Sequence, residues 1–306
     1  MLWIFLALLA PLIWAMSNQI DVYLIEKLGD TDASENFSVG GLIIISCLVA
    51  ITVLPIAAII DPTVFAIPFI EKILLIVVGI IEGLAILLYL YALQEDDAAS
   101  ITAWFNSVPL MNLILGFLIL GEVISPSQYI GFAITLFGLI VLSVKKDEFG
   151  IIFKKRIAGL MLLASLGFST MTVLFKFIAS IDSFLASSFW QYSGLLLLGI
   201  FFFVAIPQYR KSFLLVFKKR GASFYAINLV NETLFVSGSL VANYAALLAP
   251  IALVSLFGSF QPLIVLLIGV GITYVTKKQR IVISRQERYL QVVGILLTIV
   301  GLVFII

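Results

Sequence analysis

The chain has 306 residues, of which 62% are hydrophobic and 11% are charged, with a formal net charge of +1 and no histidine. A soluble globular chain is nearer half apolar and a quarter charged, so this composition excludes an ordinary soluble domain and favours a protein in contact with a lipid bilayer. The near-neutral net charge argues against a nucleic-acid partner.

The apolar runs, taken in chain order, predict ten membrane-spanning helices, because one spanning helix needs about 20 mostly apolar residues. The predicted segments are 2–21, 39–60, 72–93, 99–120, 127–144, 157–178, 184–206, 223–247, 250–274 and 289–306. The first run lacks a basic start and a small-residue cleavage site, so we expect it to stay as a helix. Polar connections such as 208–221 and 276–288 are predicted as loops, and strand-like alternation is absent. The predicted fold class is an all-α integral membrane protein.

An internal repeat divides the ten segments into two halves. At a shift of 153 positions, residues 91–116 fall on 244–269, and QYIGFAITLFGL at 128–139 recurs as QVVGILLTIVGL at 291–302. The predicted organisation is therefore a five-helix repeat at 1–144, a basic linker loop at 145–156 and a second five-helix repeat at 157–306. Because five is odd, the second repeat must cross the membrane in the opposite direction, which predicts two inverted repeats.

Lysine and arginine gather on one side of this predicted bundle. Of the 18 basic residues, only Lys72 and Lys176 fall outside the odd-numbered loops. Basic loops stay in the cytoplasm, so we expect the odd-numbered loops to be cytoplasmic and both termini to be outside. The expected location is the plasma (cytoplasmic) membrane of a prokaryote.

Two acidic residues lie at membrane depth, where ionisable side chains are costly and usually face a cavity. Glu82 is near the centre of the third segment, and Glu232 lies about ten residues into the eighth, at a position that the repeat places close to Glu82. Desolvation favours the neutral form of a carboxylate, which suits proton exchange. We expect one or both to bind a coupling proton or a cationic group of a substrate. The alternative is a protonated acid that is bonded to a neighbouring helix.

Polar residues in the eighth segment recur at helical spacing around Glu232. They are Asn228, Asn231, Ser239 and Asn243. Such a stripe must face protein or water, so we favour lining of a cavity over hydrogen bonding between helices. In the first segment Ser17, Asn18 and Asp21 cluster on one face, and we expect Asp21 to lie at the membrane interface.

Two prolines interrupt matching segments of the two halves. Pro109 and Pro262 lie in the middle of the fourth and ninth segments, where each removes a helical hydrogen bond and predicts a kink. The polar or aromatic residues near them are Trp104, Asn106, Ser259 and Gln261. Broken helices at matching places are typical of the central site of a transporter. A static kink that improves packing is the alternative.

Four glycines and one acid are interpreted as structural. Gly131, Gly138, Gly294 and Gly301 occupy one face of the fifth and tenth segments, where we expect close helix packing instead of ligand contact. Glu122 is expected to stabilise a short turn. Lys176, near a helix end, is expected to extend toward the membrane interface.

These stretches resemble the drug/metabolite transporter superfamily, and specifically proteins with two EamA-type domains. The resemblance rests on Pro109, the run LILGFLILGE at 113–122, Gln128 and the GFAITLFG run. It rests equally on SFQPLIVLLIG at 259–269 and the final QVVGILLTIVG, and it covers nearly the whole chain. The resemblance implies a transporter fold without naming a substrate, because relatives move amino acids, nucleotide sugars, sugar phosphates or drugs.

The sequence thus predicts a secondary transporter that moves a small polar organic metabolite, amino-acid-like or drug-like, by alternating access with proton coupling or exchange. The alternatives are a lipid-carrier translocase and a non-transporting membrane sensor or assembly protein. The single Cys47 excludes an intramolecular disulfide, and no phosphate-binding loop, metal-ligand spacing or catalytic motif occurs in the sequence. We therefore expect no enzymatic activity, cofactor or metal, and a monomer or homodimer whose partners are the substrate and the bilayer.

Overall fold

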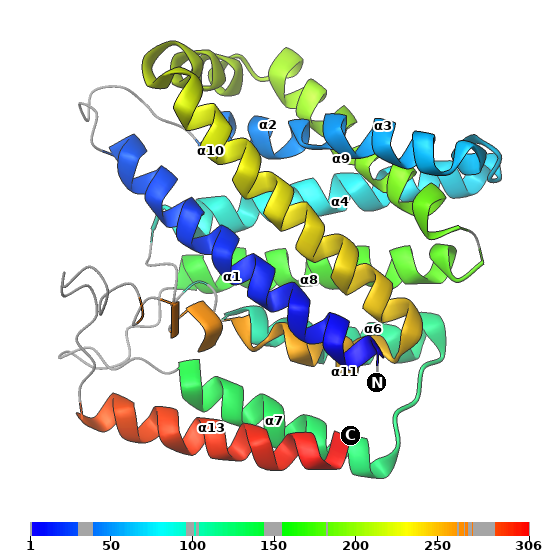
Figure 1. Ribbon diagram of the computed structural model, residues 1–306, viewed down its shortest axis with the longest axis vertical. Coiled ribbons are helices and arrows are strands. Elements are labelled where there is room, and N and C mark those ends of the chain that lie inside the picture. Colours follow the sequence, from blue (N-terminus) through cyan, green and yellow to red (C-terminus); the bar gives the residue numbers. More distant parts are fainter. Residues whose placement is uncertain are drawn as a thin grey trace.

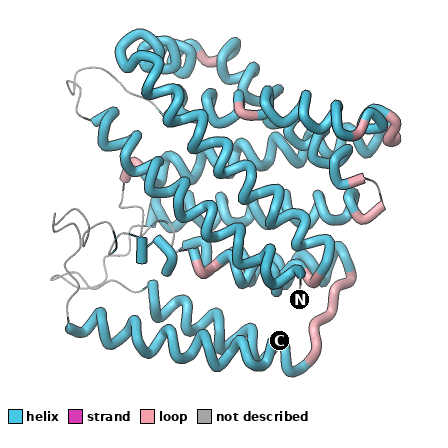
Figure 2. Tube along the Cα trace, viewed as in Figure 1, coloured by secondary structure: helices cyan, strands magenta, loops and turns pink. Residues whose placement is uncertain are grey.

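A computed structural model describes residues 2–29, 39–95, 101, 104–143, 155–181, 183–261, 263–265, 267–268, 271 and 285–305. Helices make up nearly all of this part of the chain, and it contains no strand (Figure 2). The all-α prediction is confirmed for these residues.

The helices follow the predicted order (Figure 1). The first half contains α1 (Leu2–Gly29), α2 (Val39–Leu48), α3 (Ala50–Ile60), the 3-10 turn η1 (Pro62–Phe65) and α4 (Phe69–Leu93), then the 3-10 turn η2 (Trp104–Asn106), α6 (Ser107–Leu115), the π-helical turn η3 (Gly116–Leu120) and α7 (Pro126–Ser143). The second half contains α8 (Lys155–Ala179), α9 (Phe184–Ala205), α10 (Pro207–Leu248), α11 (Ile251–Gly258) and α13 (Arg285–Ile305).

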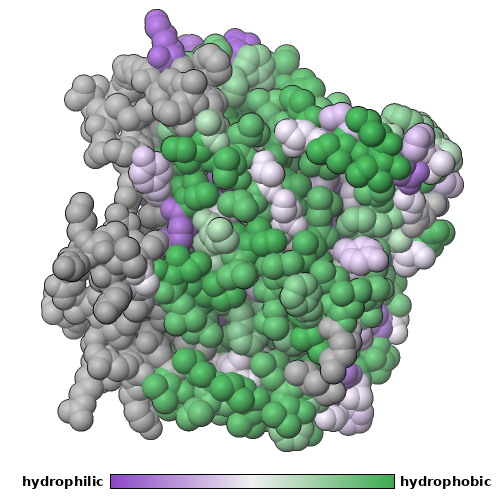
Figure 3. All heavy atoms as spheres, in the orientation of Figure 1, coloured by the Kyte–Doolittle hydropathy of each residue, from purple (hydrophilic) through white to green (hydrophobic). Residues whose placement is uncertain are grey.

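The helices are apolar on the outside of the molecule as well as inside it. Five stretches are long and apolar enough to cross a membrane, namely Leu2–Asp21, Val39–Ile60, Phe69–Leu93, Lys155–Ala179 and Phe184–Ala205. Shorter apolar helices include Trp104–Leu120, Pro126–Val141 and Val292–Ile305. Ile59, Phe69 and Val303 are each at least 75% exposed, and apolar side chains cover most of the face shown in Figure 3. An apolar surface of this extent fits lipid and not water, so the chain is an integral membrane protein.

The predicted loop at 208–221 is wrong, because these residues are helical and continue into the next segment as the 42-residue α10. Pro207 occupies the first turn of α10, where its missing N–H costs no helical hydrogen bond. The basic residues that suggested a loop lie within this helix. The second predicted segment also differs, because it is divided at Val49 into α2 and α3. Residues 145–154 and 272–284, in two other predicted loops, lie outside the described residues.

Helix contacts recur in matching pairs between the two halves. Helix α4 packs against α8 and α9, while α10, in the same place of the second half, packs against α1 and α2. Helix α6 contacts α8, and α11 contacts α1. Three further pairs join equivalent elements of the two halves, namely α2 with α9, α6 with α11, and α7 with α13. These larger helix contacts keep their pattern when the two halves are exchanged, whereas smaller ones, such as α8 with α9, have no counterpart of similar size among the described residues.

The main buried core lies where α2, α4 and α9 meet. Tyr192 and Leu195 of α9, together with Ile43 and Ile44 of α2, are almost fully buried there. This region is tightly packed because Gly79 of α4 lies directly on the α9 backbone, where an added Cβ would come within 1.8 Å of the Gln191 carbonyl oxygen. Close helix contact of this kind fixes α4 and α9 relative to one another.

Helices α7 and α13 lie side by side at the lower edge of Figure 1. A Cβ at Gly138 would lie 2.8 Å from the Gly294 carbonyl oxygen, and one at Gly131 would lie 2.6 Å from the Gly301 carbonyl oxygen. The four glycines therefore lie in one helix–helix seam, as close packing requires. The Thr298 hydroxyl donates to the Gly294 carbonyl 2.8 Å away, so its polar atom is satisfied inside the seam.

Candidate functional site

A cavity of about 170 Å³ lies between the two halves of the molecule. Its walls come from α1, α2, α4, η2 and α6 of the first half and from α8, α10 and α11 of the second half. A cavity of about 150 Å³ is large enough to hold a benzene molecule. The space therefore fits one small organic solute.

Two carboxylates line the cavity, and each is held by a hydrogen bond from a neutral side chain. The Ser46 hydroxyl of α2 donates to Glu232 Oε1 of α10 at 2.5 Å. Asn231 Nδ2 donates to Asp21 Oδ1 of α1 at 2.6 Å, and the Ser17 hydroxyl donates to Asn231 Oδ1 at 2.8 Å. Asp21 thus contributes to the cavity wall, whereas its position near a helix end had suggested an interfacial place.

A second chain of hydrogen bonds crosses the cavity wall through neutral groups. Gln261 Nε2 donates to Asn18 Oδ1, and Asn18 Nδ2 donates to the Tyr89 hydroxyl oxygen at 3.0 Å. On the other side the Ser169 hydroxyl of α8 donates to Asn112 Oδ1 of α6 at 2.5 Å. Asn18 and Asn112 were not on the predicted list of site residues. Asn18 had a sequence signal, its polar cluster with Ser17 and Asp21, whereas the signal of Asn112 is only an amide within a predicted membrane span.

Most, but not all, of the polar residues predicted in this part of α10 line the cavity. Asn231, Glu232, Ser239 and Asn243 line the cavity. Asn228 is buried but does not line it. The Ser239 hydroxyl donates to the Phe235 carbonyl of its own helix at 3.1 Å, so its hydrogen bond is local.

Glu82 lies away from the cavity, in the contact between α4 and α9. The side chain is completely buried, and Gln191 Nε2 of α9 donates to its Oε2 at 2.7 Å. Glu232 accepts its bond from α2 as Glu82 accepts its bond from α9. The two acids therefore accept hydrogen bonds from different helices, and of the two only Glu232 lines the cavity.

Pro109, one of the two prolines predicted to break a helix, lies next to the junction of two helical elements. Pro109 lies in the first turn of α6, directly after the 3-10 turn η2, where a proline is tolerated. Phe105 of η2 lines the cavity, while Trp104 and Asn106 do not. Asn106 is buried, and its Nδ2 donates to the Leu139 carbonyl oxygen of α7 at 3.5 Å. Pro262 lies outside the described residues, whereas the neighbouring Ser259 and Gln261 line the cavity.

Aromatic side chains form much of the remaining wall. Tyr89 and Phe105 lie with ring centroids 5.6 Å apart, and Phe105 meets Phe168 edge-on at 5.8 Å. Trp14 Nε1 donates to the Phe235 carbonyl oxygen at 3.2 Å, which fixes the indole against α10. All five residues line the cavity. Two buried polar atoms of the wall, Asn243 Nδ2 and Ser259 Oγ, have no protein partner.

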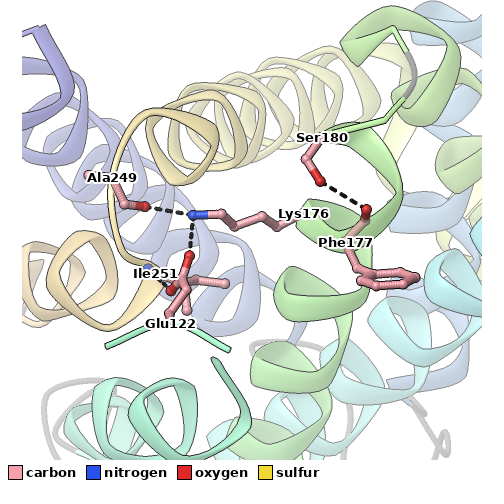
Figure 4. A network of polar contacts seen from close by, with 6 residues as sticks. All are labelled: Glu122, Lys176, Phe177, Ser180, Ala249 and Ile251. Atoms are coloured by element: carbon pink, nitrogen blue, oxygen red, sulfur yellow. Dashed lines mark hydrogen bonds and ion pairs between the residues drawn. The ribbon is translucent and has the colours of Figure 1, made fainter. Parts of the chain in front are cut away.

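An ion pair joins α8 to the segment between η3 and α7, next to the start of α11 (Figure 4). Lys176 Nζ of α8 lies 2.5 Å from Glu122 Oε1 and donates to the Ala249 carbonyl oxygen at 2.7 Å. The Ile251 amide donates to Glu122 Oε2 at 2.8 Å. Lys176 therefore bonds within the protein, in contrast to the expected extension toward the membrane interface.

Comparison with known proteins supports the interpretation of the fold. Residues 1–144, slightly less than half of the chain, match the model of the EamA-like transporter family, in agreement with the resemblance to the drug/metabolite transporter superfamily. The chain is also similar to a protein of known crystal structure, with a TM-score of 0.60 and 14% identity over 97% of this chain and 95% of that chain. At that identity the likeness shows a shared fold. No curated protein sequence matches the chain.

Proposed function

We propose that this membrane protein is a secondary transporter for a small organic solute. The match of residues 1–144 to the EamA-like transporter family supports this proposal. The observation that carries the proposal is the central cavity, which has charged and polar walls inside an otherwise apolar molecule. A polar wall at this depth is costly in lipid and is expected where a polar solute binds.

The proposed mechanism is alternating access around this cavity. Both halves contribute walls, so a change in their relative position opens the cavity toward one side of the membrane and closes it toward the other. The exchange of helix contacts between the halves supports two five-helix repeats of inverted orientation, because α4 and α10 hold equivalent places. We also propose that the basic segments predicted as odd-numbered loops, including the first turns of α10, face the cytoplasm of a prokaryotic cell.

Glu232 is the residue that we propose to carry a coupling proton. It is 8% exposed, lines the cavity and accepts one hydrogen bond from Ser46. A carboxylate in this setting releases its proton readily only when another positive charge takes its place or when the cavity opens to water. Protonation and solute binding at Glu232 would then exclude each other, which is one way to couple a proton gradient to transport.

The test is solute flux into proteoliposomes that contain the purified protein, with and without an imposed pH gradient. We expect the flux of at least one small solute to respond to the gradient, and we expect Glu232→Gln to abolish that response. A matched assay of lipid movement between leaflets distinguishes a solute transporter from a lipid-carrier translocase. Lipid movement without solute flux would overturn the proposal, as would the absence of both.

A further inference from the structure

The charges of the cavity wall are all of one sign. Asp21 and Glu232 line it, whereas none of the described lining residues is a lysine or an arginine. The two carboxylates also interact electrostatically with each other. Two like charges around a space of low dielectric are unfavourable unless protons or a bound cation compensate them.

The carboxylates have capacity left for a ligand. A carboxylate offers about four acceptor sites on its two oxygens. Ser46 donates to Oε1 of Glu232 and Asn231 donates to Oδ1 of Asp21, while the Tyr89 hydroxyl also bonds to Asp21. All three partners are neutral groups. A neutral donor orients a carboxylate without cancelling its charge. The two carboxylates can therefore still accept hydrogen bonds from a positively charged donor group of a ligand.

The aromatic part of the wall fits the same ligand. Trp14, Tyr89, Phe105, Phe168 and Phe235 surround the cavity, and the faces of such rings attract cations as well as apolar groups. The cavity volume of about 170 Å³ limits the apolar body of the ligand to the size of about one ring.

Two buried groups give an independent indication that something is bound here. Asn243 and Ser259 are 2% and 3% exposed, and within the part of the chain that the structure describes Asn243 Nδ2 and Ser259 Oγ have no hydrogen-bond partner. Buried polar atoms are almost always paired, because an unpaired one has lost its hydrogen bonds to water without replacement. Both residues line the cavity, so a bound solute is the natural partner.

We propose that the central cavity recognises a monovalent organic cation, namely a primary amine that carries an apolar body of about one aromatic ring. The ammonium group bonds to Asp21 and Glu232, the ring packs against the aromatic wall, and Asn243 and Ser259 face the ligand. This inference rests on the proposed transport function and names its substrate class. A carboxylate-bearing solute, including an amino-acid zwitterion, is disfavoured because its negative charge has no basic partner in the described wall.

A charge series with one shared ring tests the inference on the unmodified protein. Phenethylamine, 3-phenylpropionate and phenylalanine are compared as ligands of the purified protein in micelles, by thermal shift and by calorimetry. We expect phenethylamine to bind at least tenfold more tightly than either carboxylate-bearing compound. Equal or tighter binding of 3-phenylpropionate or phenylalanine, or no binding of phenethylamine, would overturn the inference.

Conservative variants then locate the ammonium group. Glu232→Gln and Asp21→Asn are each expected to weaken phenethylamine binding about tenfold, while Glu95→Gln is expected to change it less than twofold. Glu95 pairs with Arg156 at 3.0 Å and does not line the cavity, so it reports the effect of removing a distant charge. Binding that is unchanged in both cavity variants would contradict the assignment. If a variant fails to fold, the charge series alone decides.

Flux measurements separate this inference from the proposed function. Proteoliposomes are given phenethylamine, phenylalanine and 3-phenylpropionate in turn. Transport of either carboxylate-bearing compound but not of phenethylamine would leave the transporter assignment standing and refute the cation site. Binding of phenethylamine that depends on Glu232, without flux of any solute, would support the cation site and refute transport.

Discussion

The ion pair between Glu122 and Lys176 gives the sharpest test of how this assembly is held together. The two side chains are only 18% and 13% exposed, and the charged atoms lie 2.5 Å apart. Removing one partner leaves the other charge poorly solvated. An exposed pair contributes about 0–1 kcal/mol, whereas breaking a fully buried one costs about 3–5 kcal/mol. For this intermediate exposure we expect Glu122→Gln or Lys176→Met to destabilise the protein by about 2–3 kcal/mol.

The double variant is expected to be less destabilised than the sum of the two single variants. With both charges gone, no unpaired charge remains, and the lost bond to the Ala249 carbonyl costs about 1 kcal/mol. We therefore expect a coupling free energy of about 1–3 kcal/mol between the two positions. A chain of this length loses roughly 2 °C of unfolding midpoint per kcal/mol, so each single variant should unfold roughly 4–6 °C earlier.

The assay is thermal unfolding of the purified variants in one detergent, followed by tryptophan fluorescence. The control cycle uses Glu95→Gln and Arg156→Met, whose side chains are 32% and 75% exposed. The coupling there should stay below about 1 kcal/mol. Additive effects at Glu122 and Lys176, or a coupling no larger than in the control cycle, would refute the reasoning.

Three further predictions concern packing, the second buried acid and pH. Gly138→Leu should destabilise the protein by about 1–3 kcal/mol or more in thermal unfolding, because its Cβ would meet the Gly294 carbonyl oxygen and the Thr298 amide at 2.8 Å. The control is Gly159→Ala, which should be neutral or stabilising because nothing lies within 4 Å of its Cβ. Equal changes in the stability of the two variants would contradict this prediction. Glu82→Gln should leave solute binding within twofold of the parent value, because Glu82 bonds to Gln191 outside the cavity, and a tenfold loss in calorimetry would show the assignment to be wrong. Hydrogen bonds from Thr63, and to a smaller extent from Ser183, hold the pKa of Asp61 below its usual 3.8. The ionised Asp61 therefore stabilises the folded protein at pH values above 3.8. This stabilisation is lost as the pH falls through the lowered pKa of the folded state. Asp61→Asn should make the unfolding midpoint less sensitive to pH below about 4, and an unchanged acid dependence would exclude this role.

The sequence predicted helices well in the long apolar segments, where the backbone must form its hydrogen bonds within the segment. An apolar run of about 20 residues must satisfy its backbone internally, so its helical state follows from composition alone. Charge is a weaker guide to helix ends. Lys211, Lys218 and Lys219 suggested a loop, yet a long basic side chain extends from a helix as readily as from a loop, and α10 continues through this region.

The depth of a polar residue was easier to predict than the direction in which it points. Glu82 and Glu232 both lie inside long helices and are buried, as their place in apolar runs predicted. Periodicity gives one face of a helix, but α4 and α10 are packed on several faces, so the neighbour that each acid meets depends on tertiary contacts. Asn112 shows the same limit, because a lone amide in an apolar run carries no signal of its Ser169 partner on α8.

The seam between α7 and α13 constrains how the molecule can move. Its backbones touch through glycines, and the threonines of the seam occupy the gaps between them: a Cβ at Gly301 would meet Thr135 Oγ1 at 2.2 Å. Sliding either helix along the other would bring a side chain onto a carbonyl oxygen. The glycines and threonines of the seam therefore fix the register of α7 against α13. Each helix belongs to a different half of the chain, so the seam joins the two halves at a contact whose register is fixed.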